Sequence, residues 1–402
     1  MSKDKAILLF GLVTYGIGQS LLYVIFAPLS RDLGLSEWQF GALISSSNIA
    51  LVIFSPMWGR VSQSIGRKTV FIIGLIGYAA GYALLGFGIQ IGLWAWLTSV
   101  PLFFLLFGAR LVYGSLASAI SPAATAYVAD TTDEQNRSAG MALIAASGGI
   151  GTIIGPAFGG LLAKVGPVVP MYVASVLAIV AAILAVIKLS EPTRHVDTES
   201  GIKLRILDSR IFPYLVGWFV IFMVFTAVQV ITAYYIEDRF GVTDRAQVIS
   251  VASIALLSMA VVMLVVQIVV MQIWKLRPKL LLRSAYFIFA GTLLLFAFSN
   301  SLLLMYVSYA GMGLSFALAA PGLNAAASLA VEEREQGAVA GLLSSAPAFG
   351  MVFGPFFGGA VYNLAPKLPM LGGAILSILV GISFLFVRIP DPVGNTEPAT
   401  GA

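Results

Sequence analysis

Twelve runs of mostly apolar residues follow one another along the chain, separated by short polar segments. The hydrocarbon core of a bilayer is about 30 Å thick, and roughly 20 apolar residues in a helix cross it. Because lipid offers no hydrogen-bonding partners, each span must satisfy its own backbone groups, as a helix does. The runs predict an all-α integral membrane protein with twelve transmembrane helices, over 6–29, 38–59, 69–91, 98–129, 137–163, 167–189, 212–236, 246–273, 280–299, 301–328, 336–363 and 367–388.

Composition excludes several kinds of function. Only 10% of the residues are charged and 59% are hydrophobic, whereas soluble domains carry about 25% charged residues. The chain has no cysteine and one histidine, His195, in a polar segment. Disulfides, thiolate metal sites and cysteine nucleophiles are therefore excluded. We expect a protein that is not an enzyme and needs no metal or cofactor.

The polar segment 190–211 is the one long connection between spans, and it lies at mid-chain. It predicts an N-terminal six-helix bundle over 1–189, a cytoplasmic linker over 190–211 and a C-terminal six-helix bundle over 212–390. The segment 391–402 is rich in Pro and Gly and is predicted to be a disordered tail.

A repeated motif relates the two halves. The pattern G-x-x-x-G-P-x-x-G-G begins at Gly151 and again at Gly350, 199 residues later. At the same offset Gly114 matches Gly313 and Pro122 matches Pro321. Parallel six-helix repeats are an architecture of secondary transporters, whose substrate site lies between the halves near the bilayer midplane. The repeat predicts two pseudo-symmetric bundles around a central cavity.

Basic residues in the loops predict the orientation. With both termini cytoplasmic, seventeen of the 23 Lys and Arg residues lie on the cytoplasmic side and five on the other, while Arg110 lies within a span. We therefore expect a multi-pass protein of a bacterial inner membrane with both termini in the cytoplasm. The basic residues are scattered over short loops, which argues against nucleic-acid binding.

Three motifs resemble those of the major facilitator superfamily. They are Gly59-Arg-Val-Ser-Gln-Ser-Ile-Gly-Arg-Lys68 between the second and third spans, Arg110-Leu-Val-Tyr-Gly114 in the fourth, and the Gly151 motif in the fifth. Together they resemble the twelve-helix drug:proton antiporter-like exporters of that superfamily. The resemblance implies transport by alternating access between two rocking bundles, and gating roles for Gly59, Gln63, Gly66 and Arg67. Relatives usually carry Asp where this chain has Gln63, so we expect a weaker cytoplasmic latch, unless Gln is simply tolerated there.

Glycine and proline in the fifth and eleventh spans also suggest gating. Small residues let two backbones approach closely in lipid, and proline removes a helix hydrogen bond. We expect these residues to pack each span against the opposite half as a sliding surface; a static tight crossing is the alternative. The residues are Gly151, Gly155, Pro156, Gly159, Gly354 and Pro355.

Arg110 is the one ionisable residue that the sequence places deep in a span. A charge at bilayer depth costs at least ~2.5–3.5 kcal/mol on insertion scales and is a functional candidate by default. In similar exporters this arginine lines the cavity or takes part in proton coupling. The alternative is an arginine held by backbone carbonyls that merely ties helices together.

The cavity candidates are polar or aromatic. Tyr15, Gln19 and Tyr23 recur every four residues on one face of the first span. We add Arg110, Tyr113, Gln229 and Asn324 as substrate-binding candidates, each of which could instead pack between helices. An aromatic, sparsely polar wall suits an organic solute better than a sugar.

No acid lies deep in a span, so a proton carrier must lie near a span end. We name Asp32, Glu237 and Asp238 as the proton-coupling candidates; solvated loop acids are the alternative. The predicted task is export of a small organic compound, drug-like or carboxylate-bearing such as a siderophore, by proton-coupled antiport. The expected partners are that substrate, protons and membrane lipids, with the protein as a monomer. A facilitator or importer of an organic anion is the alternative, whereas a sensor or a membrane-embedded enzyme lacks the domain or residues it would need.

Overall fold

The computed structural model describes residues 3–132, 134–192, 204–268, 277–387 and 389, and this part of the chain is helical throughout apart from its connections. The N-terminal half contains α1 (Lys3–Asp32), α2 (Glu37–Ile65), α3 (Arg67–Leu93), α4 (Ser99–Ala117), α5 (Ile120–Thr131), α6 (Glu134–Ala163) and α7 (Val169–Lys188). The C-terminal half contains α8 (Phe212–Phe240), α9 (Arg245–Ile268), α10 (Pro278–Ala297), α11 (Leu302–Leu329), a 3₁₀ turn (Glu333–Glu335), α12 (Gln336–Tyr362) and α13 (Leu368–Phe386). Half of the predicted linker, residues 193–203, and the predicted tail 391–402 lie outside the described residues.

The helices account for the twelve predicted spans. Eleven segments among the described residues are long and apolar enough to cross a bilayer, and α6, a 30-residue helix whose apolar part is Ser147–Ala163, corresponds to the twelfth predicted span. The fourth span is broken into α4 and α5, which together cover Ser99–Thr131. Pro122 lies just after the break, where its missing N–H leaves the carbonyl of Ser118 without a helix partner.

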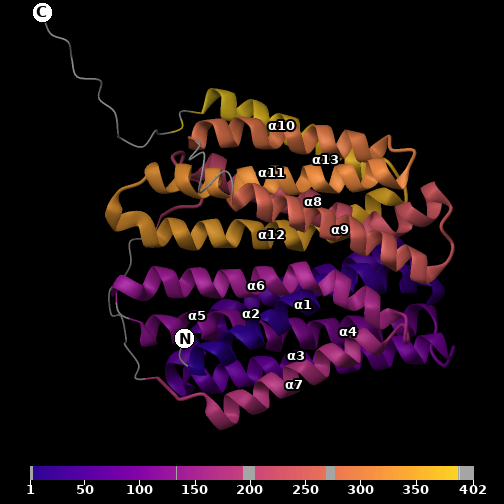
Figure 1. Ribbon diagram of the computed structural model, residues 1–402, viewed down its shortest axis with the longest axis horizontal. Helices are drawn as coiled ribbons and strands as arrows, with labels where there is room; N and C mark the ends of the chain where they lie inside the picture. The colour runs from indigo at the N-terminus through magenta and orange to yellow at the C-terminus, as the bar shows by residue number, and fades with distance from the viewer. Residues whose placement is uncertain (1–2, 133, 193–203, 269–276, 388, 390–402) are drawn as a thin grey trace, which may run out of the picture.

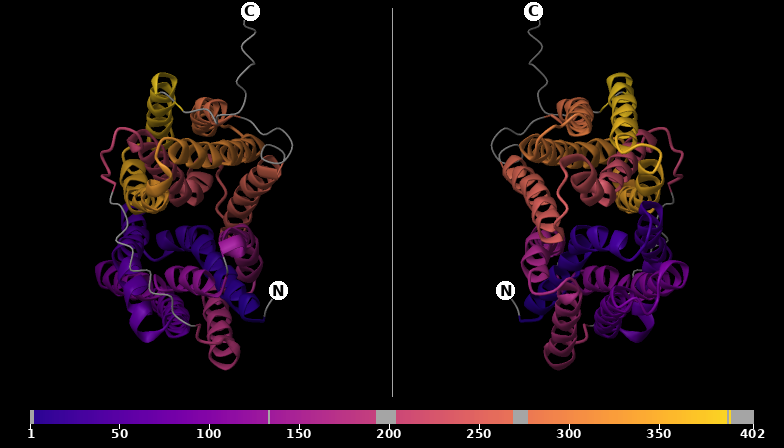
Figure 2. Two further views of the ribbon diagram at one scale, coloured as in Figure 1. Left: turned by 90° about the vertical axis from the view of Figure 1, so that its left-hand side faces the viewer. Right: turned by 90° about the vertical axis from the view of Figure 1, so that its right-hand side faces the viewer.

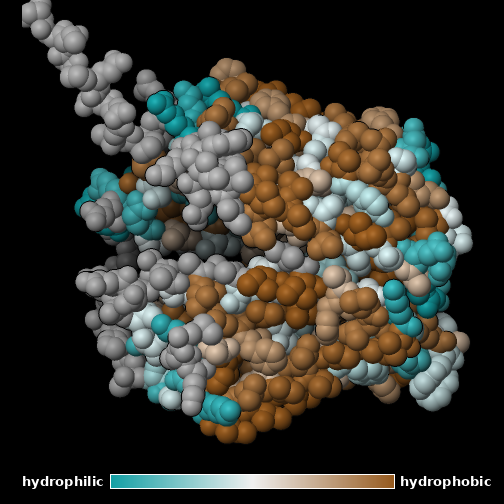
Figure 3. Space-filling model, viewed as in Figure 1, coloured by the Kyte–Doolittle hydropathy of each residue, from teal (hydrophilic) through white to brown (hydrophobic). Residues whose placement is uncertain are grey.

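The two halves form separate bundles that lie side by side, α1–α7 in one and α8–α13 in the other (Figures 1 and 2). On the face seen in Figure 3, hydrophobic residues cover the middle of the molecule and hydrophilic residues gather toward its two ends. Helices α1 and α8 both begin at one end of the molecule, which we call the linker end. The opposite end, where the α1–α2 and α8–α9 connections lie, is called the far end.

The repeated glycines give close backbone crossings, but mostly within their own half. A Cβ on Gly151 would lie 2.8 Å from the Cα of Gly16 in α1, and one on Gly155 would lie 2.6 Å from the carbonyl oxygen of Ile17. Gly159 likewise packs on α1, and Gly354 packs on α8. The expectation that these glycines face the opposite half is therefore wrong. Only the last glycine of each motif reaches across, Gly160 to Ser253 and Gly359 to Glu37 and Trp38.

The Gly59–Lys68 motif is not the loop that the sequence suggested. Residues up to Ile65 continue α2, and Gly66 alone separates α2 from α3. Gly66 has φ +107, in the region that favours glycine, and a Cβ there would also lie 2.6 Å from the Glu191 carboxylate.

Candidate substrate cavity and gates

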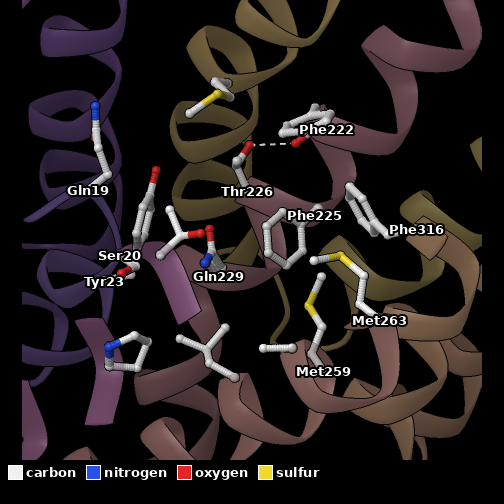
Figure 4. A pocket seen from close by; sticks show the side chains of 15 residues that line it. Gln19, Ser20, Tyr23, Phe222, Phe225, Thr226, Gln229, Met259, Met263 and Phe316 are labelled. Carbon is white, nitrogen blue, oxygen red and sulfur yellow. Dashed lines mark hydrogen bonds between the residues drawn. The ribbon is translucent and has the colours of Figure 1, made fainter. Parts of the chain in front are cut away.

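A cavity of about 310 Å³, the inner chamber, lies between the two halves. Figure 4 shows Gln19, Ser20 and Tyr23 of α1 on one side and α8, α9 and α11 on the other. Thr152 and Pro156 of α6 and Met351 of α12 complete it. The C-terminal half supplies most of the chamber lining, which is largely apolar: Phe222, Phe225, Thr226, Gln229, Leu256, Met259, Ala260, Met263 and Phe316.

The chamber wall is aromatic and adaptable. Phe316 lies against Phe222 and Phe225 in edge-on contacts, with ring centroids 5.4 and 5.0 Å apart. Met259 and Met263 add unbranched, polarizable side chains, which accommodate ligands of different shape. No charged side chain is among the residues that line the chamber, and its polar groups come from Gln19, Ser20, Tyr23, Thr152, Thr226 and Gln229. Such a wall suits an aromatic organic compound held by stacking and a few hydrogen bonds.

A second cavity of about 510 Å³, the vestibule, adjoins the chamber on the side of the linker end. The two cavities share Gln19 and Met351. The vestibule is lined by α2, α12 and the start of α5, and it carries five serines: Ser55, Ser118, Ser121, Ser344 and Ser345. At the linker end the surface is hollowed between the halves (Figure 3). The chamber is thus approached from the linker end.

The far end is closed by a cluster of charges centred on Arg31. Its guanidinium donates to Glu37 at 2.7 Å within its own half, and to Glu237 at 2.9 Å and Asp238 at 2.7 Å in the other half. Tyr362 donates a 2.7 Å hydrogen bond to Asp238. Because one cation holds carboxylates from both halves, this cluster joins them.

Further contacts between the halves lie on the same side of the chamber. Arg245 pairs with Asp32, and Ser30 shares a hydrogen bond with Tyr234. Ser253 of α9 donates a 3.0 Å hydrogen bond to the carbonyl of Pro156. The cross-half hydrogen bonds and ion pairs of the described residues are concentrated from mid-membrane to the far end, which defines a state open toward the linker end.

Pro355 creates one of these contacts. Proline has no N–H, so the carbonyl of Met351, four residues earlier, lacks its helix partner. The side chain of Asn48 in α2 donates a 2.6 Å hydrogen bond to that carbonyl, and the next backbone N–H, of Phe356, donates to Ser45 at 3.1 Å. Pro355, a gating candidate from the sequence, therefore also exposes a backbone acceptor to the other half.

Arg110 and Tyr113 lie inside the N-terminal bundle, behind the cavity wall rather than on it. Arg110 is 3% exposed, donates a hydrogen bond to Ser47, and lies 4.6 Å from the ring of Tyr113. Around them the rings of Tyr78 and Tyr82 pack against Tyr113. No carboxylate of a described residue bonds this guanidinium.

At the linker end, the ion pairs of the described residues lie within single halves. Arg67, 6% exposed, pairs with Asp130 at 2.9 Å and donates to Ser62 at 2.6 Å. Arg210 joins the end of the linker to the turn before α12 by pairing with Asp208 at 2.8 Å and Glu335 at 2.9 Å. Hydrogen bonds from the Arg210 side chain lower the pKa of both carboxyls.

The structure brings some of the predicted site residues together and separates others. Gln19, Tyr23 and Gln229 meet in the chamber, and Tyr15 lines the vestibule. Asn324 lies elsewhere, in a separate cavity toward the linker end, where it accepts a hydrogen bond from Trp218 at 3.3 Å. Asp32, Glu237 and Asp238 all lie in the far-end closure.

Sequence reasoning missed two groups of residues. One is the aromatic and Met wall beside the predicted Gln229, which includes Phe222 and Phe225 of α8. The other is the set of cations, Arg31 and Arg245, that hold the far-end acids. No signal along the chain pairs residues more than 200 positions apart.

Comparison with known proteins agrees with this architecture. A family model described as Major Facilitator Superfamily matches residues 8–296 and 269–402. The chain is 28% identical over 398 residues to Multidrug resistance protein 2 of Bacillus subtilis, with 94% of each chain covered. It is 27% identical over 417 residues to the class B Tetracycline resistance protein of Escherichia coli, with 99% of each covered.

Solved structures share the fold. A bacterial homolog of the human lysosomal transporter Spinster, in an inward-facing and occupied conformation, superposes with a TM-score of 0.72 at 14% identity, covering 96% of this chain and 97% of that one. A nucleoside transporter gives a TM-score of 0.74 at 14% identity, covering 96% and 99%. With two helical bundles around a cavity and the family model matching nearly its whole length, this chain belongs to the Major Facilitator Superfamily of membrane transporters.

Proposed function

We propose that this protein exports aromatic, amphipathic organic compounds from the cytoplasm by alternating access, in exchange for protons. The observation that carries the proposal is the inner chamber, with its phenylalanine and methionine wall and its few amide and hydroxyl groups. The relatives named for multidrug and tetracycline resistance support the same substrate class. Siderophores and other carboxylate-bearing metabolites fit the uncharged chamber less well.

The orientation follows from the basic loops. The positive-inside rule assigns the linker end to the cytoplasm of a bacterial inner membrane. The state described above then faces inward, where an exporter takes up its substrate. We place the protein in the membrane as a monomer, and the apolar face seen in Figure 3 would then contact lipid.

The far-end cluster is our candidate for proton coupling. Four carboxylates, Asp32, Glu37, Glu237 and Asp238, face two arginines, Arg31 and Arg245. Four negative charges against two positive leave a negative excess at the end that opens toward the acidic side, which is why we place the proton carrier here. The same acids join the halves, so protonation and opening are linked.

Inverted membrane vesicles test the proposal. Respiration acidifies their interior and quenches a pH-sensitive dye, and addition of ethidium or tetracycline should partly restore the fluorescence as protons leave in exchange. Vesicles without the protein are the control. A dye signal unchanged by a compound that the vesicles nevertheless accumulate would contradict proton antiport.

One observation favours a second function, transport of an organic anion. Arg110 is a buried cation without a carboxylate partner among the described residues, and a substrate carboxylate could supply it. Concentrative uptake of a radiolabelled organic acid such as benzoate, lost in Arg110→Gln, would favour this function over the export of aromatic compounds.

A further inference from the structure

Two buried polar atoms in the N-terminal bundle have no hydrogen-bond partner, and they lie together. They are Nε of Arg110 and the hydroxyl of Tyr113. The residues are three apart in α4, on the same face of the helix. A buried N–H without an acceptor costs free energy, and a buried charge without a counter-charge costs more.

Both the Nε–H of Arg110 and the hydroxyl of Tyr113 need a hydrogen-bond acceptor. The guanidinium has donors and no acceptor, and its other contacts are the Ser47 hydroxyl and the Tyr113 ring. The neighbouring tyrosines already have acceptors: Tyr78 donates to the carbonyl of Thr14 at 3.1 Å, and Tyr82 donates to that of Gly18. What is missing beside α4 is therefore an electron-rich group.

The charge indicates what kind of acceptor is missing. The described residues place no carboxylate against Arg110, and the far-end acids are already paired with Arg31 and Arg245. A neutral water oxygen would satisfy a donor but leave the cation uncompensated in a low-dielectric interior. A small anion satisfies the donors and balances the charge.

The site lies close to the vestibule. Ser47, which holds Arg110, is adjacent in sequence to Asn48 of the vestibule wall. Tyr15 lines the vestibule, and its ring contacts Tyr78, which contacts Tyr113, with centroids 6.2 and 5.7 Å apart. An anion that enters the vestibule would therefore reach the two donors by displacing these packed rings.

We propose that Arg110 and Tyr113 form a binding site for a small monovalent anion, a halide or a carboxylate group. The anion is either a resident inorganic ion from the cytoplasm or the acid group of a transported compound. The site lies outside the aromatic chamber, so it stands whether or not the chamber carries drugs. Binding is measured without transport, which keeps its failure distinct from failure of the proposed export.

Thermal unfolding of the purified full-length protein in detergent tests the site. Sodium chloride or sodium formate replaces sodium methanesulfonate at constant ionic strength. A ligand that binds only the folded state raises the unfolding temperature in a saturable way. We expect such a rise in chloride, in formate or in both. Chloride alone identifies a resident inorganic ion, and formate alone identifies a carboxylate source.

Substitutions of Arg110 and Tyr113 test whether the anion raises the unfolding temperature by binding at this site. Arg110→Gln should remove the saturable rise, and Tyr113→Phe should weaken the apparent affinity by about tenfold, as expected for one hydrogen bond to a charged group. Tyr286→Phe is the matched control, because its hydroxyl is also buried without a partner but lies in the other half, where the nearby Arg283 already donates to the carbonyls of Phe384 and Leu385. It should leave the anion response unchanged.

Two results would overturn the proposal. One is equal unfolding temperatures of the wild type in all three salts, which would mean that water alone satisfies the donors. The other is an anion response that persists unchanged in both Tyr113→Phe and Arg110→Lys. Tyr113→Phe keeps the ring and Arg110→Lys keeps the charge, so both variants test the site even where Arg110→Gln does not fold.

Discussion

Phe222 illustrates how a single side chain shapes the proposed substrate site. Its ring faces the inner chamber and packs edge-on against Phe316 at 5.4 Å, so the substrate meets a shaped aromatic surface rather than loose chains. Aromatic pairs contribute about 0.5–1.5 kcal/mol beyond the area they bury. Stacking on this wall, more than any charge, should set how tightly an organic compound is held.

Replacing Phe222 by Ala tests that role. We expect the KM for ethidium transport to rise up to about tenfold, because ~1.4 kcal/mol of binding corresponds to a factor of ten. Phe104→Ala is the control, since Phe104 is 63% exposed on the outside of the other half. Equal KM values for wild type and Phe222→Ala would remove this ring from the substrate site.

The sequence predicted part of this site. Tyr15, Gln19 and Tyr23 are polar or aromatic residues at helical spacing in an apolar span, so the cavity face of α1 could be recognised. The wall around Phe222 could not, because a phenylalanine in a span looks the same whether it faces lipid, a neighbouring helix or a cavity. Asn324 is a polar residue within a span that does not line the chamber. Its amide oxygen instead accepts a hydrogen bond from Trp218.

At the scale of helices, the repeated glycines fix how closely α6 and α12 lie against α1 and α8. The length of the apolar runs was enough to predict the spans. It could not predict the partner helices, because a glycine stripe indicates a close crossing without saying which helix crosses. Packing α6 on α1 of the same half makes each bundle a stiff unit, and the two bundles then move as bodies.

Gly155→Ala tests this crossing. The new Cβ would lie 2.6 Å from the carbonyl oxygen of Ile17, so one helix must shift. Overpacking of this kind costs about 1–3 kcal/mol, and the unfolding temperature in detergent should fall. Gly148→Ala is the matched control in the same helix, because a Cβ there meets no atom within 4 Å. Equal losses in the two variants would refute the close-contact argument.

For the whole molecule, the far-end cluster holds the two bundles together while the linker end stays open. Arg31 is the central cation of the cluster because it binds Glu37 of its own half and Glu237 and Asp238 of the other half. Without the Arg31 guanidinium, the carboxylate of Glu37 repels those of Glu237 and Asp238 in the other half.

Arg31→Ala should therefore shift the protein toward a state open at the far end. The chain has no cysteine, so spin labels can be placed freely at Trp96→Cys and Leu364→Cys, two exposed far-end positions on opposite halves. We expect a longer distance between these labels in Arg31→Ala than in the unchanged background. Arg239→Ala is the control, since Arg239 bonds Asn300 within its own half. A distance unaffected by loss of Arg31 would show that the cluster does not hold the far end closed.

Alternating access is the central claim, and two distances measured on one protein test it most directly. A second label pair at Thr125→Cys and Gly337→Cys, both exposed toward the linker end, reports the opposite gate. With ethidium added and the pH lowered, the linker-end distance should shorten while the far-end distance lengthens, in the same fraction of molecules. If both distances lengthen together, or one changes while the other stays fixed, the two bundles do not rock about the chamber as described.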